Sequence, residues 1–302
     1  MLAGTALALS AEKRAARGMN SWEIDKGILI RGAIIAALDP TLISLGSCHW
    51  NIGVLYAIGV SMMAMALLRH MATLPLVILS LTWIFFGEWV TELVWNPPGS
   101  SSPIAALFMA SYASPDLLIH YPMIPWLALM MLGWVLGRHI VSFKAGTAKI
   151  SPEKILWITG IFALIIFFVV RGFNGYGNMF LYRTDNSWQQ WLHVSKYPPS
   201  LSYYALECGL LAIILAFLMR IEPVIGVRQK GPILVFGQTA MFYYLLHRLV
   251  LETSATYFNV HGFGDISTTY ITWALMVVPL YYTCLWYRKV KTSHPQSLLR
   301  YF

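Results

Sequence analysis

The segment Lys196-Tyr197-Pro198-Pro199-Ser200 leads directly into an apolar run over residues 201–218. A proline ring replaces the amide hydrogen, so this segment stops any helix from continuing backwards, whereas proline at a helix start costs little. The pattern predicts a polar loop that ends sharply at the edge of a membrane-spanning helix. Two interpretations of Lys196 remain open. Its side chain reaches lipid phosphate groups beside a rigid helix start, or it lies at the rim of a site that opens on one side of the membrane.

The composition is that of an integral membrane protein. Hydrophobic residues make up 58% of the chain and charged residues only 11%, whereas soluble domains carry about 25% charged residues. Trp (12) and Tyr (16) are abundant, as expected for side chains that settle at the membrane–water interfaces. The net charge of +8 indicates basic cytoplasmic loops rather than nucleic-acid binding. We therefore expect the lipid bilayer, and no nucleic acid, as a partner.

The apolar segments predict an all-α transmembrane bundle. A spanning helix needs about 20 mostly apolar residues, and residues 1–10 are apolar over only half that length, so they resemble the end of a further span. We expect about eight full spans plus this partial one, in a single domain over residues 1–302. The eight segments are residues 28–45, 52–68, 74–95, 122–141, 155–170, 201–219, 232–251 and 270–286.

The distribution of basic residues predicts the orientation. With eight alternating spans, 17 of the 21 lysines and arginines fall on one side, which the positive-inside rule places in the cytoplasm together with the C-terminus. Two long loops, residues 96–121 and 173–200, lie on the other side. The apolar piece 104–112 is too short to span, so it lies in the interface or re-enters. Long loops on one face indicate that the substrate-specific work is done there.

Ionisable side chains inside spans are expensive and are candidates for function by default. Glu88 and Glu92 lie four residues apart on one face of the third span. We give a functional and a structural role equal weight for this pair. Glu207 enters the sixth span from its outer end, and His247 lies in the seventh, where an imidazole can exchange a proton near neutral pH. With Lys196, these four residues are the candidate catalytic groups.

On the inner side, arginines predict a site for a phosphorylated ligand. Arg31 lies in the first span, Arg69 ends the second, and Arg14 and Arg17 precede both. Guanidinium groups bind phosphate through paired hydrogen bonds. The orientation of the chain and anionic lipid headgroups explain the same residues equally well, so both interpretations stay open.

The remaining reactive side chains favour ordinary structural roles. Cys48, Cys208 and Cys284 share no metal or redox spacing, so we expect inert small side chains and no metal site. Arg248 and Glu252 are four residues apart near water, and we expect an interfacial ion pair.

An ordered set of short motifs resembles a known family. The set resembles the bacterial membrane proteins related to the catalytic domain of heparan-alpha-glucosaminide N-acetyltransferase, from Met1 to about Thr283. The motifs are Leu2-Ala3-Gly4-Thr5, Arg31-Gly32, Leu55-Tyr56-Ala57-Ile58-Gly59-Val60-Ser61-Met62, Tyr121-Pro122-Met123-Ile124-Pro125-Trp126, Asn174-Gly175-Tyr176-Gly177, Lys196-Tyr197-Pro198-Pro199-Ser200, and Phe236-Gly237 through Phe242-Tyr243-Tyr244-Leu245-Leu246-His247.

This resemblance implies a multispan acyltransferase of the bacterial inner membrane. The implied reaction takes an acetyl group from cytoplasmic acetyl-CoA to an amino or hydroxyl group of a sugar or glycan on the far side. It requires no metal, and a homodimer is a further expectation. The resemblance also implies one more span before Met1, followed by a histidine implicated in catalysis. No position of this sequence matches that histidine, so we expect the family's first span to be missing from it.

Two other functions compete with the transferase. The chain could be a transporter or flippase of a lipid-linked or anionic solute, with the buried acids as a proton relay, or a non-catalytic membrane scaffold. The transferase hypothesis predicts that the five candidate catalytic residues converge on one cavity that is reachable from outside. It also predicts that this cavity connects to a basic opening around Arg31.

Overall fold

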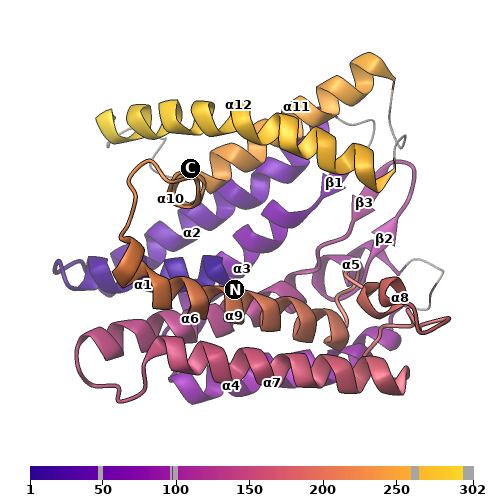
Figure 1. Cartoon of the computed structure of the whole chain (residues 1–302), viewed down its shortest axis with the longest axis horizontal. Helices are drawn as coiled ribbons and strands as arrows, with labels where there is room; N and C mark the ends of the chain where they lie inside the picture. The colour runs from indigo at the N-terminus through magenta and orange to yellow at the C-terminus, as the bar shows by residue number, and fades with distance from the viewer. Residues whose placement is uncertain (47–49, 96, 98–100, 260–264, 295–302) are drawn as a thin grey trace. The chain divides into compact units, whose positions relative to one another are not determined.

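The computed structural model of the chain describes residues 1–46, 50–95, 97, 101–259 and 265–294. Cys48, one of the three cysteines considered above, lies outside the described residues. Two compact units are present. The first unit comprises Met1–Pro40 and His49–Ile221, and the second comprises Thr41–Cys48 and Glu222–Phe302 (Figure 1).

Every segment predicted to span the membrane is helical. Residues 1–10 lie in α1 (Leu2–Ala15), and the predicted spans correspond in order to α2 (Ser21–Leu38), α3 (Val54–Leu68), α4 (Thr73–Glu92), α6 (Met123–Lys144), α7 (Pro152–Phe173), α9 (Leu201–Ile225), α10 (Pro232–Gln238) with α11 (Ala240–Phe258), and α12 (Ile266–Ser293). Among the described residues, α4, α6, α7 and α9 are long and apolar enough to cross a membrane, and α10 with α11 adds a fifth if that bent pair is one span.

Helices α2 and α3 fall short of a span for identifiable reasons. Helix α2 carries Glu23, Asp25, Lys26 and Arg31 within 18 residues, and α3 has only 15 residues. The molecule is therefore a mostly helical membrane protein, and the count of eight spans stays a prediction.

Helix α9 begins at Leu201, where the double proline predicts a start. The Ser200 hydroxyl accepts a hydrogen bond from the Tyr203 backbone N–H at 3.0 Å and donates one to the Ser195 carbonyl at 3.1 Å. This serine therefore satisfies an amide that the first helical turn would leave unpaired. The Tyr197–Pro198 peptide bond is cis.

Glycines let the helices of the first unit approach closely. Helix α6 is central and packs against α1, α3 and α4. A Cβ atom at Gly133 of α6 would lie 1.9 Å from the Met1 carbonyl oxygen, and one at Gly59 of α3 would lie 2.4 Å from the backbone of Ala36 in α2. Small residues at such contacts are typical of membrane helices, where close packing replaces the hydrophobic effect between helices.

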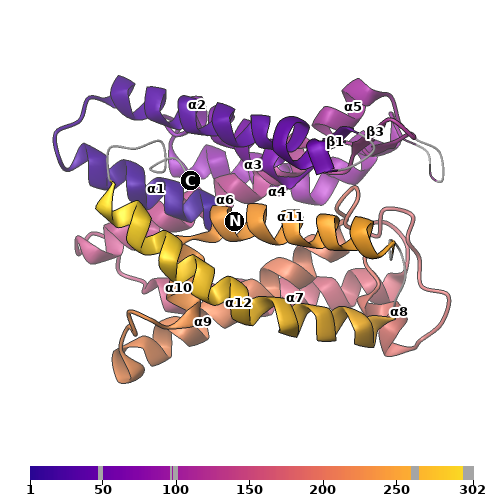
Figure 2. The same ribbon diagram turned by 90° about the horizontal axis from the view of Figure 1, so that it is seen from above.

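A small sheet stands beside the outer ends of α2 and α3. Strands β1 (Trp50–Ile52), β2 (Tyr112–Ala113) and β3 (Leu117–Ile119) form the order β1-β3-β2, with β1 parallel and β2 antiparallel to β3. The short helix α5 (Pro103–Phe108) lies next to it (Figure 2). The all-α prediction includes no strand, so this sheet is a correction to it. The apolar piece predicted at residues 104–112 divides between α5 and β2.

Helices α10, α11 and α12 form the second unit. The axes of α10 and α11 differ by 88° at Thr239, whose buried hydroxyl donates to the Val235 carbonyl at 2.8 Å. The Phe242 and Tyr287 rings stack with centroids 4.1 Å apart and so join α11 to α12. The predicted seventh span is therefore a broken helix whose second part carries His247.

Replacing Gly59 by Val tests the close approach of α2 and α3. The new side chain collides with the backbone of α2, so we expect Gly59→Val to lower the free energy of unfolding by about 2 kcal/mol. Gly237→Val is the matched control, because a Cβ at Gly237 meets nothing within 4 Å. It should change stability by less than about 0.5 kcal/mol. Thermal unfolding in detergent measures both, and equal effects would contradict the packing described.

Candidate functional site

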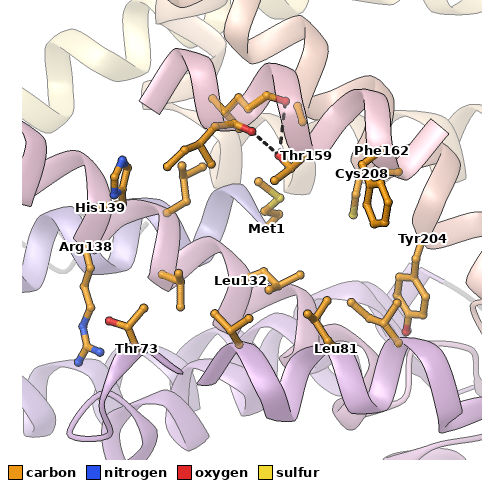
Figure 3. A pocket seen from close by; sticks show the side chains of 18 of the residues that line it. Met1, Thr73, Leu81, Leu132, Arg138, His139, Thr159, Phe162, Tyr204 and Cys208 are labelled. Atoms are coloured by element: carbon orange, nitrogen blue, oxygen red, sulfur yellow. Dashed lines mark hydrogen bonds between the residues drawn. The ribbon is translucent and has the colours of Figure 1, made fainter. Parts of the chain in front are cut away.

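A groove of about 730 Å³ runs through the first unit between α4, α6, α7 and α9. Its volume lies in the range of small-molecule sites. Leucine, isoleucine, valine, phenylalanine and alanine side chains form most of the walls. Polar side chains gather toward the ends: Arg138 and His139 lie at one end, and Tyr204 and Cys208 lie at the other (Figure 3).

The predicted orientation places one end of the groove on the cytoplasmic side. On α4 its walls extend from Thr73 to Phe85, which is about 18 Å at 1.5 Å per helical residue. The hydrocarbon core is about 30 Å thick. In the predicted orientation, Thr73 and Arg138 lie on the cytoplasmic side, so the groove leads from there to beyond the middle of the membrane.

A second, much smaller cavity adjoins the far end of the groove. Its volume is about 10 Å³, and its walls include Glu88, Thr91 and the two prolines that precede α9. Three residues line both cavities: Ile84, Leu201 and Tyr204. Tyr204 is only 3% exposed, and its ring extends from α9 toward α4 (Figure 3). This tyrosine therefore stands in the wall between the groove and the small cavity.

Glu88 is a buried carboxylate with one oxygen satisfied. The residue is 6% exposed. Its Oε1 accepts a hydrogen bond from the Met179 backbone N–H at 2.9 Å, whereas its Oε2 has no hydrogen-bond partner among the described residues. Burying a polar oxygen without a partner costs free energy. The arrangement is therefore one that a functional site retains more readily than a structural one.

Glu92 lies one turn farther out on α4 and is half-buried. Both carboxylates lie close enough to Tyr176, in the loop after α7, to affect its pKa. Burial, and then the negative charges of Glu88 and Glu92, raise the pKa of Tyr176 to about 12. The Tyr176 hydroxyl donates to the Phe85 carbonyl at 2.5 Å. The structure thus brings both predicted acids against the loop that closes the outer side of α4.

Arg171 holds that loop in place. This arginine, near the outer end of α7, is 0% exposed. Its guanidinium donates to five acceptors, namely the Trp191 carbonyl (3.2 Å), the Asn178 Oδ1 (2.7 Å), the Leu181 carbonyl (2.9 Å), the His193 carbonyl (2.9 Å) and the Gln190 carbonyl. Residues 178–193 are therefore wrapped around one buried cation.

The wrapped loop presents strained backbone to Glu88. Met179 and Phe180 have φ angles of 50° and 62°, which residues with a side chain rarely adopt. Such a conformation persists only where the surrounding structure imposes it. The hydrogen bonds of Arg171 supply that constraint and aim the Met179 N–H at the Glu88 carboxylate.

Lys196 lies on two tyrosine rings. Its Nζ is 5.5 Å from the ring centroid of Tyr121 and 5.2 Å from that of Tyr197, and the two hydroxyls are 2.7 Å apart. Burial lowers the pKa of the Lys196 ammonium, but the two tyrosines outweigh burial and raise it above its ordinary value. Burial and the bond to Tyr197 raise the pKa of Tyr121 to about 12. Lys196 is thus a fixed cation beside the prolines that line the small cavity.

Two predicted residues do not join this region of the first unit. Glu207 is exposed on α9 and lines neither cavity. His247 belongs to the second unit, where its Nδ1 lies 3.1 Å from the Tyr243 carbonyl and its ring stacks on that of Tyr243. Glu88 and Glu92 both lie near Tyr176, whereas Lys196 lies on Tyr121 and Tyr197. Of the five predicted catalytic residues, only Glu88 lines either of the two cavities described. The expected convergence on one cavity is therefore not observed, and the catalytic roles of all five residues stay predictions. Near His247, Arg248 and Glu252 approach to 4.0 Å, as expected for an interfacial pair.

The predicted phosphate-binding arginines differ in how they are paired. Arg69 is bound to Asp25 and donates to the Ser21 carbonyl at 2.9 Å. Arg17 is exposed. Arg31 is half-buried, and its Nε has no hydrogen-bond partner among the described residues. Arg14 lies close enough to Arg31 to repel it. A buried donor next to a like charge favours an anion as the ligand.

Three important residues were not singled out by sequence reasoning. Tyr204 is hidden in an apolar run, and Arg138 reads as one of many basic residues on the cytoplasmic side. Arg171 had a detectable signal, because it is one of only four basic residues on the outer side. Among the described residues, no group of three His, Cys, Asp or Glu side chains is placed to hold a metal ion.

Comparison with known proteins gives one match. The family model described as "Heparan-alpha-glucosaminide N-acetyltransferase, catalytic" matches residues 1–172. No curated protein and no solved structure matches the chain. The matched region ends in α7 and contains Glu88 and the four predicted phosphate-binding arginines.

Replacing Arg171 by Lys tests the account of the outer loop. A lysine ammonium has three donors, so at least two of the five acceptors lose their partner, and each loss costs about 1–3 kcal/mol. We expect Arg171→Lys to lower the free energy of unfolding by about 3 kcal/mol and to speed proteolysis within residues 174–195.

Arg220→Lys is the control for this substitution. The Arg220 side chain is 72% exposed and lies 3.3 Å from Glu153 Oε1 on the surface, so its replacement should cost less than about 1 kcal/mol. An Arg171→Lys protein with unchanged unfolding and proteolysis would contradict the central role of the buried cation.

Proposed function

We propose that this chain, which belongs to the heparan-alpha-glucosaminide N-acetyltransferase catalytic family, transfers an acetyl group across the membrane. The donor is cytoplasmic acetyl-CoA, and the acceptor is an amino or hydroxyl group of a sugar on the outer side. The observation that carries the proposal is the groove from Arg138 to Tyr204, which ends beside the buried carboxylate Glu88.

The groove suits the narrow, mostly uncharged arm of a CoA thioester. Its walls are largely apolar, and hydroxyls of Ser142 and Thr159 are available along them. A thioester that enters at the Arg138 end carries its acetyl group toward Tyr204 in the outer half of the membrane. A thioester is already activated, so the protein's task is to position the two substrates and to remove a proton.

Arg14 and Arg31 are the groups that bind the phosphates of CoA. Helices α1 and α6 run in the same direction, because Gly4 meets Met130 while Ala8 meets Gly137. Arg14, near the end of α1, is therefore on the same side of the membrane as Arg138 on α6. A phosphate between Arg14 and Arg31 satisfies the Arg31 Nε and removes the repulsion between the two guanidinium groups.

Glu88 is the base that accepts the acceptor's proton. As the amine or hydroxyl attacks the acetyl carbon, a C–N or C–O bond forms, the C–S bond breaks, and the proton passes to the carboxylate. Lys196 and its tyrosines flank the outer approach, where they hold a sugar by stacking and hydrogen bonding. The protein works in the bacterial inner membrane with its C-terminus in the cytoplasm, and a homodimer is the expected assembly.

Radiolabelled acetyl-CoA tests the proposal directly. Purified protein in detergent should bind acetyl-CoA and transfer the label to glucosamine or a glucosaminide. Arg31→Gln should raise the KM for acetyl-CoA about tenfold or more with little change in kcat, because a charged hydrogen bond contributes about 1.5–3 kcal/mol. Lys149→Gln, in an exposed loop on the same side, should leave both constants unchanged. A wild-type protein that neither binds acetyl-CoA nor transfers acetyl would overturn the proposal.

A transporter is the second candidate, and the broken helix favours it. Helices α10 and α11 meet at 88°, and interrupted helices form solute sites in many transporters. A transporter reconstituted in vesicles would move an anionic sugar or lipid-linked solute in response to a proton gradient without acetyl-CoA. Uptake that is independent of acetyl-CoA, together with no acetyl transfer, would favour this function over the transferase.

A further inference from the structure

We propose that Tyr204 and Glu88 hold one water molecule between them and that this chain of groups carries a proton from the acceptor side to the sulfur of the acyl donor. The inference rests on the proposed function and assigns Tyr204 a catalytic role. It identifies Tyr204 as the residue through which the groove and the Glu88 cavity communicate.

The position of Tyr204 is the first observation. It lines both the 730 Å³ groove and the 10 Å³ cavity. The other two shared residues, Ile84 and Leu201, have hydrocarbon side chains. Within the described part of the chain, Tyr204 therefore supplies the only side-chain polar group common to both walls. A proton that moves between the cavities through side chains must therefore pass its hydroxyl.

Unsatisfied polar atoms are the second observation. Glu88 Oε2 and the Tyr204 hydroxyl are both buried and lack hydrogen-bond partners among the described residues. Both residues border the small cavity, whose volume of about 10 Å³ is at the lower limit, about 10–15 Å³, of what a site needs to hold one water molecule. A single water there donates to Glu88 and to Tyr204 and satisfies both orphan atoms.

Trp83 completes the surroundings of the hydroxyl. Its indole also borders the small cavity and interacts with the Tyr204 oxygen without reaching hydrogen-bond geometry. An indole N–H is only a donor, so it leaves the Tyr204 proton free to point into the groove. The thioester sulfur is the acceptor that the proposed function places there.

The proton balance closes without any further reactant. The acceptor loses its proton to Glu88 as the C–S bond breaks and the electron pair stays on sulfur. Glu88 then returns the proton to the water, the water gives one to Tyr204, and Tyr204 gives its own to the thiolate. A thiolate is a stronger base than a carboxylate, so the net transfer of the proton to sulfur is favourable. Concerted movement leaves Tyr204 protonated throughout.

Tyr204→Phe removes the relay while keeping the ring. With acetyl-CoA, we expect kcat to fall about a hundredfold, as for the loss of a general acid. With an acetyl thioester of an acidic aryl thiol, the thiolate leaves without a proton, so the loss should shrink to less than about threefold. Tyr203→Phe is the matched control, because Tyr203 is the neighbouring residue on α9 and lines neither cavity. It should behave as wild type with both donors.

Each outcome separates this inference from the proposed function. A wild-type protein with no acetyl transfer overturns both. Normal wild-type transfer with an unaffected Tyr204→Phe protein, or an equal loss with both donors, overturns the relay alone. An equal loss would mean that the hydroxyl only supports the shape of the groove.

Infrared spectroscopy tests the bridging water without any turnover. The carboxyl band assigned by its loss in Glu88→Gln should shift in Tyr204→Phe, because the water loses one of its two partners. The same band should not shift in Tyr203→Phe. An unchanged band in Tyr204→Phe would show that no water links the two groups and would overturn the inference.

Discussion

The buried guanidinium of Arg171 is the interaction on which the outer half of the first unit depends. A cation that is 0% exposed near the outer end of a membrane helix is tolerated because five acceptors surround it. Those acceptors come from the loop itself, so the guanidinium can be buried only when the loop folds around it. The loop in turn provides the N–H that binds Glu88 and the prolines that close its cavity. Without Arg171, Glu88 would lose both its hydrogen bond from Met179 and the loop that closes its cavity.

The polar groups of the first unit are arranged along one route. Arg138 lies at one end of the groove, apolar walls follow, and Tyr204 separates these walls from Glu88. Membrane helices avoid buried polar atoms unless a ligand, a water or another side chain satisfies them. Arg31 Nε, the Tyr204 hydroxyl and Glu88 Oε2 are among the buried polar atoms without a hydrogen-bond partner in the described part of the chain, and the proposed function gives each of them one. The apolar groove extends from Arg138 to Tyr204, and the proposed transfer uses it as the path of the acyl donor.

Much of this architecture is predictable from the sequence, and the missing parts have physical reasons. Apolar runs predict the helical segments, and the double proline predicts the start of α9 at Leu201. The cost of burying a charge marks Glu88 as a candidate functional residue. Tyr204 has no signal of its own, because a tyrosine in an apolar helix also fits a lipid interface. The outward position of Glu207 depends on how α9 is rotated, which packing decides rather than local sequence. Strand β1 pairs with β3, which is distant in the chain, and β2 and β3 are too short to leave a pattern in the sequence.

Photoaffinity labelling tests the central claim most directly, since that claim places the acyl group of the donor beside Tyr204. A CoA thioester whose short acyl chain carries a diazirine would be irradiated with the full-length protein in detergent, and the labelled residues identified by mass spectrometry. The account predicts labels on α9 between Tyr204 and Cys208 and on α4 between Leu81 and Phe85, all suppressed by excess acetyl-CoA. Labels confined to other parts of the chain, or labels that acetyl-CoA does not suppress, would contradict it.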